Sequence, residues 1–162
     1  CAMGKYPVEC VETMDKISKT IEGAIKYWKR FNKKGLKDKK EDLESSIAYT
    51  TCVTAEHTDA DAIVAYTHKG DSIRKLAGLG AGCPIFAITD DEKTYHQLSV
   101  SFNVYPVLST EGKTIEETIS NGIEILKQQG ILETGDTVIL SGGAKILPDA
   151  TDNKVIGGFV KI

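Results

Sequence analysis

Hydrophobic residues recur every three or four positions along the first 28 residues of the chain. The run follows Pro7, which suits the first turn of a helix because the amide that proline lacks is not used there. The recurring residues are Val8, Val11, Met14, Ile17, Ile21, Ile25 and Trp28. The spacing predicts one long amphipathic helix from Pro7 to about Trp28.

After residue 44 the pattern changes to helices that alternate with short, continuous apolar runs. Such runs are typical of strands covered on both faces. We expect strands at 62–66, 84–88, 104–108, 137–140 and 155–162, and helices at 47–55, 72–79, 92–100 and 114–129. The alternation predicts an α/β fold with a mostly parallel sheet between helix layers. Only a loop joins the last two strands, which allows the final strand to run antiparallel.

Composition and charge narrow the function classes. The chain has 162 residues, a net charge of −3 and 41% hydrophobic residues, as expected of one soluble globular domain. Its basic stretch at 33–40 is interrupted by acidic residues, so we favour a solvated linker over a basic binding patch. We find no apolar run of about 18 residues and no secretion signal. These patterns predict a cytoplasmic protein without nucleic-acid or membrane partners.

Residue types that carry chemistry are present but not arranged for catalysis or metal binding. Cys1, Cys10, Cys52 and Cys83 form no CxxC pair and have no histidine at ligand spacing, which predicts reduced thiols and no metal. No nucleophile is paired with a base, so we expect no catalytic residue. The acidic run 90–92 favours a helix cap over a magnesium site.

Two glycine-rich segments have simple interpretations. The segment 78–82 ends a predicted helix and precedes a strand, so a helix stop is favoured over a dinucleotide loop. The segment 141–145 follows a strand but lacks the phosphate-loop spacing. We interpret it as a flexible loop that can contact a ligand bound at the segment 67–72, the candidate binding site of this chain.

The segment 67–72 is the best candidate binding site. It leaves the first buried strand and enters a helix, and ligands of open α/β sheets collect at the carboxyl ends of strands. Thr67 and Ser72 supply hydroxyls, Lys69 a cation and Gly70 room for close backbone approach. Two readings stay open: a phosphate site at the helix N-terminus, or a helix that Ser72 or Asp71 simply caps.

Several motifs resemble pyruvate kinases in the same order along the chain. The segment 4–9 (GKYPVE) is similar to the motif that opens the last helix of the catalytic barrel in that family. Segments 62–72, 83–89 and 135–142 are similar, respectively, to the effector-loop strand, the next strand and the penultimate strand of its C-terminal domain. The resemblance implies that residues 1–22 are the tail of the barrel, 23–44 a helix end and charged linker, and 45–162 the regulatory domain.

The resemblance also implies a fold and a function. The fold would be a three-layer α/β/α sandwich with a five-stranded, mostly parallel sheet whose last strand is antiparallel. The function would be that of the allosteric and oligomerisation domain of the glycolytic enzyme that makes pyruvate and ATP from phosphoenolpyruvate and ADP. A phosphorylated effector would contact Thr67, Lys69, Gly70, Ser72 and, in a second loop at 148–153, Thr151.

The parent enzyme implied by the resemblance is a tetramer that uses magnesium and potassium. Its catalytic barrel would precede Cys1, so we expect a piece of a longer chain that has no cofactor and no kinase activity of its own. We expect the apolar face of the first helix, which would contact that barrel, to pack on the sandwich or on a neighbouring chain.

Three residues depart from the family pattern. Asp71 places negative charge beside the expected phosphate, Thr118 stands where an arginine is found in members that bind a bisphosphate, and Ala150 replaces a glycine. These departures favour a monophosphate, or no effector, over a sugar bisphosphate. Two other functions stay open: a free-standing α/β ligand-binding domain, and a small doubly wound transferase.

Overall fold

The computed structural model describes residues 4–34, 42–110, 114–144 and 154–161. The elements follow the predicted alternation. In chain order they are α1 (Pro7–Ala24), α2 (Tyr27–Lys34), α3 (Leu43–His57), β1 (Ala62–Tyr66), α4 (Asp71–Leu79), β2 (Ile85–Thr89), α5 (Glu92–Leu98), β3 (Val104–Leu108), α6 (Ile115–Gln128), β4 (Thr137–Ala144) and β5 (Lys154–Lys161). Among these described helices, none is both long and apolar enough to cross a bilayer.

The sheet has the strand order β3-β2-β1-β4-β5. The first four of these strands are parallel, and Val64 of β1 pairs with Phe86 on one side and with Leu140 on the other. The predicted α/β fold with a parallel sheet is therefore confirmed. The fifth strand, β5, pairs with β4 in the antiparallel direction, from Thr137↔Lys161 to Ala144↔Lys154.

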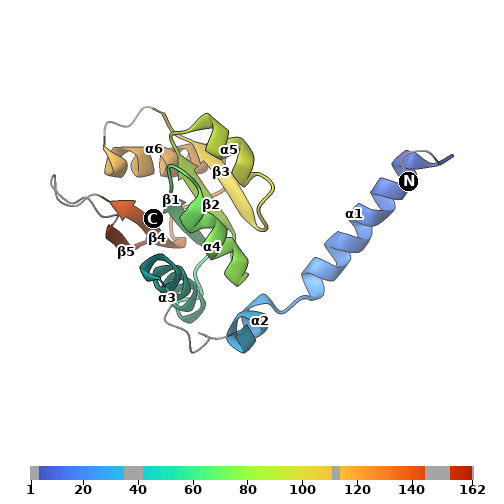
Figure 1. The fold of residues 1–162 in the computed structure, drawn as a ribbon, viewed down its shortest axis with the longest axis horizontal. Helices are drawn as coiled ribbons and strands as arrows, with labels where there is room; N and C mark the ends of the chain where they lie inside the picture. The colour runs from blue at the N-terminus through green and yellow to red at the C-terminus, as the bar shows by residue number, and fades with distance from the viewer. Residues whose placement is uncertain (1–3, 35–41, 111–113, 145–153, 162) are drawn as a thin grey trace.

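Helices cover both faces of this sheet (Figure 1). On one face, Ile63 and Ala65 of β1 belong to a core with α3, α4 and the end of α5. On the other, Ala62 and Val64 belong to a second core with α6. The two cores use alternate residues of the same strand, because successive side chains of a strand point to opposite faces.

The first helix is shorter than predicted. It ends at Ala24, and Ile25 is extended (φ −77°, ψ 123°) before α2 begins at Tyr27. The turn lets Phe31 of α2 become buried and lets Trp28 pack against the same core. Packing of these aromatic side chains thus overrides the helical periodicity that runs through Ile25.

The apolar stripe of α1, formed by Val8, Val11, Met14, Ile17 and Ile21, does not pack on the sandwich. Its members are 53–63% exposed, and α1 has no buried residue. Figure 1 shows α1 extending away from the sheet. Packing of the stripe on the sandwich was therefore a wrong prediction, because the break at Ile25 directs α1 outward; packing on a neighbouring chain stays a prediction.

Electrostatic contacts join the start of α3 to α4. Asp42 caps α3 by accepting a hydrogen bond from the Ser45 amide at 2.7 Å. Lys75 of α4 donates to Asp42 (2.9 Å) and to Glu44 (2.7 Å). The hydrogen bond from Lys75, together with that from Ser45, lowers the pKa of Asp42 to about 2. These contacts hold the start of α3 against α4.

Candidate functional site

The sheet reverses its direction of growth between β1 and β4. The chain passes from β1 to β2 and β3 on one side, then returns through α6 to place β4 on the opposite side of β1. In open α/β sheets, ligands bind outside the carboxyl ends of the strands at such a reversal. The loop that leaves β1 there is the segment 67–70, which the sequence singled out.

The segment 67–70 is closed by its own backbone and one buried hydroxyl. Gly70 is in the left-handed region (φ 85°), which other residues rarely adopt. Its amide donates to Oγ1 of the buried Thr67 at 2.8 Å. The hydroxyl of Ser72 lies 3.5 Å from the same oxygen. Three of the predicted site residues are thus brought together around Thr67 Oγ1.

Helix α4 begins without a side-chain cap. Gly70 occupies the N-cap position, and no side chain accepts a hydrogen bond there. The interpretation that Ser72 or Asp71 caps the helix was therefore wrong, because both residues lie inside the first turn. The amides of that turn have no carbonyl partner within the helix, and such a terminus favours an anion.

An arginine that the sequence analysis did not single out lies over this loop. Arg74 Nη1 donates to the Lys69 carbonyl at 3.1 Å and to Asp71 Oδ1 at 3.0 Å. Its guanidinium covers Gly70, where an added Cβ would come within 3.2 Å of it. The negative charge of Asp71 is therefore compensated locally. The i,i+3 spacing of Asp71 and Arg74 is the sequence signal that could have revealed this pair.

The neighbouring loop, after β2, contacts the candidate loop directly. His68 Nδ1 lies 2.7 Å from Asp90 Oδ1, and Thr94 Oγ1 donates to the His68 carbonyl at 2.9 Å. Asp91 accepts a hydrogen bond from the Thr94 amide at 2.7 Å and so caps α5. The prediction of a helix cap in the run 90–92 is confirmed for Asp91, whereas Asp90 serves the contact with His68.

Other predicted features lie apart from the loop. Residues 141–144 belong to β4, so their interpretation as a flexible loop was wrong. The reason is that the antiparallel pairing with β5 continues through Gly142 and Gly143. Thr118 is buried and donates to the Thr114 carbonyl. Thr151 and Ala150 lie outside the described residues.

The cysteines and acidic residues form no metal site within the part of the chain that the structure describes. Cys52 and Cys83 are buried free thiols. Burial raises the pKa of Cys52 to about 12 and that of Cys83 to about 11. Thiols held in this protonated form are poor nucleophiles and poor metal ligands.

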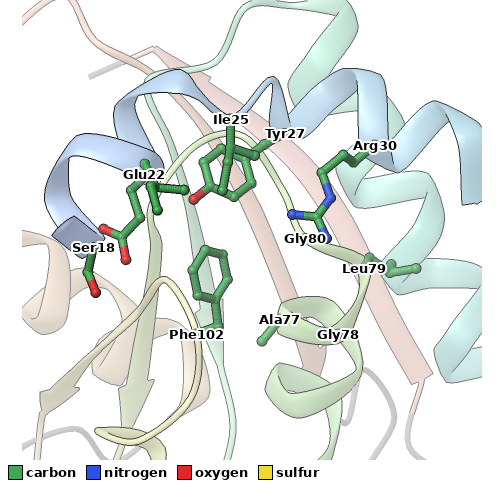
Figure 2. Close-up of a pocket in the computed structure, with 11 residues that line it drawn as sticks. Ser18, Glu22, Ile25, Tyr27, Arg30, Ala77, Gly78, Leu79, Gly80 and Phe102 are labelled. Atoms are coloured by element: carbon green, nitrogen blue, oxygen red, sulfur yellow. The ribbon is translucent and has the colours of Figure 1, made fainter. Parts of the chain in front are cut away.

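A pocket of about 470 Å³ lies where α1 and α2 meet the sandwich, beside residues that precede β2 and β3 (Figure 2). Ile25, Tyr27 and Arg30 line one side, while residues 77–80 and Phe102 line the other. The rings of Tyr27 and Phe102 are 5.6 Å apart. Because one wall belongs to α1 and α2, the shape of this pocket depends on how these helices attach to the sandwich.

Comparisons with known proteins give a consistent result. Residues 45–156 match the family model described as the alpha/beta domain of pyruvate kinase. The chain is 31% identical over 153 residues to a pyruvate kinase from Clostridium acetobutylicum, covering 94% of this chain and 32% of that protein. It is 28% identical over 142 residues to a pyruvate kinase from Thermotoga maritima, covering 88% of this chain and 29% of that protein.

A solved structure, Cryptosporidium parvum pyruvate kinase in complex with ADP, shares the fold. Its TM-score is 0.81 at 21% identity, and the match covers 98% of this chain and 31% of that one. The chain thus spans about a third of the length of the relatives it matches.

Proposed function

Since this chain belongs to the pyruvate kinase C-terminal α/β domain family, we propose that it is the regulatory and oligomerisation domain of a pyruvate kinase. Residues 1–22 would be the tail of the catalytic barrel, 23–44 the helix end and linker, and 45–162 the domain itself. The intact domain would be a three-layer sandwich with β5 as its antiparallel edge strand. The parent would be a cytoplasmic tetramer that uses magnesium and potassium.

The observation that carries the regulatory role is the uncapped N-terminus of α4 at the carboxyl end of β1. Its first-turn amides, the exposed Lys69 ammonium and the exposed Ser72 hydroxyl belong to one short segment, where together they would neutralise a phosphate. Because Thr67 is buried, its hydroxyl would hold the loop in place by accepting the Gly70 amide rather than contact the phosphate. By the family resemblance, Thr151 would be a further contact of the effector.

The ligand class that fits best is a phosphorylated metabolite with one phosphate at this loop. The loop offers Lys69 and a helix dipole, while the nearest guanidinium, that of Arg74, is already held by Asp71. Thr118 is buried and carries no charge for a second phosphate. A sugar or nucleoside monophosphate is therefore favoured over a bisphosphate.

A thermal-shift screen of the 162-residue chain tests the proposal. A phosphorylated metabolite at 100 times its Kd would stabilise the fold by about 2.7 kcal/mol. Lys69→Ala should reduce this shift, because it removes the loop cation, while Lys16→Ala on α1 should leave it unchanged. If no phosphorylated compound shifts the wild-type melting temperature, or if both variants respond equally, the phosphate site is wrong.

A free-standing α/β ligand-binding domain is the alternative function. Finding barrel sequence upstream of Cys1 in the same reading frame supports the pyruvate kinase fragment, and its absence supports the alternative. In either case the isolated chain should not turn over phosphoenolpyruvate in a coupled assay, because the catalytic residues of a barrel would precede Cys1 and only the tail of that barrel, residues 1–22, would be in this sequence.

A further inference from the structure

Two loops lie against each other at the carboxyl edge of the sheet. They follow β1 and β2, which are paired in parallel with Tyr66 opposite Ile88. Three side-chain contacts cross from the first loop and α4 to the second loop and α5. These are Thr94 Oγ1 to the His68 carbonyl (2.9 Å), Arg74 Nη2 to Gln97 Oε1 (3.1 Å), and His68 Nδ1 to Asp90 Oδ1 (2.7 Å).

Only the last of these three contacts includes a group that changes its charge between pH 5 and 8, the imidazole of His68. The hydroxyl, amide and guanidinium groups of the first two keep their protonation in that range, whereas a histidine changes its charge there. The side chains of His68 and Asp90 are 62% and 41% exposed. Protons and water therefore reach the contact without any opening of the fold.

We propose that the His68–Asp90 contact is a pH-operated clasp. It holds the segment 67–70 against the start of α5 while His68 is protonated, and it loosens when His68 loses its proton. The contact is a charge-assisted hydrogen bond in the protonated state and a weaker, neutral–anion hydrogen bond afterwards.

The charges around His68 favour its protonated form. The hydrogen bond and the charge of Asp90, with a smaller contribution from Asp91, raise the pKa of His68 above its usual 6.5, against the opposing effects of burial and Lys69. Tyr66, at the end of β1, also lies beside Asp90; burial and then Asp90 raise the pKa of Tyr66 above its usual 10, so its hydroxyl stays neutral.

The direction of the effect follows from this raised pKa. Because the folded chain holds the proton more tightly than the unfolded chain, the clasp contributes fully below pH 6.5. Its contribution is lost as the pH rises through the folded pKa. The switch therefore operates from about pH 6.5 upward, through the raised pKa of His68.

The clasp has a consequence for ligands. Lys69 and Gly70 directly follow His68, so a loosened clasp would leave the anion-facing amides of α4 and Lys69 less well positioned. This consequence rests on the proposed function, whereas the clasp itself does not. An anion would bind more tightly at pH 6 than at pH 8.

NMR titration of the chain between pH 5.5 and 8.5 tests the clasp. In the wild type, the His68 ring should titrate above 6.5, and the Gly70 amide, which is bonded to Thr67, should lose exchange protection with the same midpoint once intrinsic rates are corrected. Asp90→Asn should lower the His68 midpoint and leave Gly70 poorly protected at every pH. Glu92→Gln, which removes a carboxylate near His96, is the matched control and should change neither.

The proposal is overturned if the His68 midpoint is the same in the wild type and in Asp90→Asn, or if Gly70 protection does not depend on pH. Sulfate, whose charge is constant over this range, is the probe for the ligand arm. Weaker sulfate binding at pH 8 in the wild type, with no pH dependence in Asp90→Asn, supports both proposals. If the His68 midpoint and Gly70 protection behave as expected but sulfate does not bind, the clasp proposal stands and the phosphate site is refuted.

Discussion

At the scale of single residues, close packing in this domain requires glycine, which has no side chain, at position 122. Gly122 faces Ile88 so closely that an added Cβ would lie 2.5 Å from Ile88 Cδ1. The contact lets α6 pack directly on β2 in the second core, where Ile88 is fully buried. Position 122 therefore accepts no larger residue without movement of the helix or of Ile88.

We predict that Gly122→Ala destabilises the domain by about 1–3 kcal/mol, because overpacking of a buried interface costs more than the helix gains from alanine. The measurement is the midpoint of urea unfolding. Gly78→Ala in α4 is the control, since a Cβ there meets no atom within 4 Å. It should leave the midpoint unchanged or raise it, and equal losses in both variants would contradict the packing argument.

At the scale of elements, the attachment of α2 to the sandwich depends on two of its aromatic residues, Trp28 and Phe31. A Cβ at Gly82 would lie 2.5 Å from Nε1 of Trp28, so the indole rests directly on the loop before β2. Phe31, in the same helix, stacks near Tyr49 of α3 with ring centroids 5.2 Å apart. Helix α2 is thus held at two places.

Gly82→Ala should displace the indole ring of Trp28 and shift its fluorescence emission to the red, since the ring would become more exposed to water. Trp28 is the single tryptophan of the chain, so the signal is unambiguous. The same Gly78→Ala variant should keep the wild-type spectrum. An unchanged emission in Gly82→Ala would show that Trp28 does not rest on this loop.

The type and order of most elements could be predicted from the sequence, because the periods of helices and strands differ. The break at Ile25 could not, because the apolar spacing continues through it and only the burial of Phe31 requires the turn. The end of β4 was missed because Gly142 and Gly143 are typical of loops. Their place in a strand depends on pairing with β5, the next strand, which their own composition does not reveal.

The candidate site was predictable to a similar degree. Thr67, Gly70 and Ser72 lie close together in sequence, so a local pattern suffices to group them. The contact between His68 and Asp90 joins two loops 22 residues apart. It requires β1 and β2 to be neighbours in the sheet, which spacing alone does not determine.

At the scale of the whole molecule, α1 stands apart from the rest. Its apolar stripe is exposed although the remainder of the described chain buries two cores. Contiguous exposed apolar surface of this kind marks a site of protein contact. In the proposed parent enzyme the catalytic barrel would cover it.

We predict that the isolated 162-residue chain associates through this stripe. Val11→Asp combined with Ile17→Asp should convert it to a monomer in sedimentation velocity experiments, because two buried carboxylates would oppose the contact. Thr13→Asp combined with Thr20→Asp adds the same charge to α1 outside the stripe and should not. A wild-type chain that is monomeric at high concentration would contradict this prediction.

The strand order has a consequence for how the chain acquires its fold. The pairs β1–β2 and β2–β3 form between successive strands, but Ala62 of β1 must wait for Val138 of β4. Closing so long a loop is slow, and until it closes one edge of a central, fully apolar strand has no partner. During synthesis, a chain that has not yet reached Thr137 therefore exposes unpaired backbone N–H and C=O groups along one edge of β1. These groups can pair with another chain. Once the last sixth of the sequence has been made, β4 pairs with β1 and covers this edge.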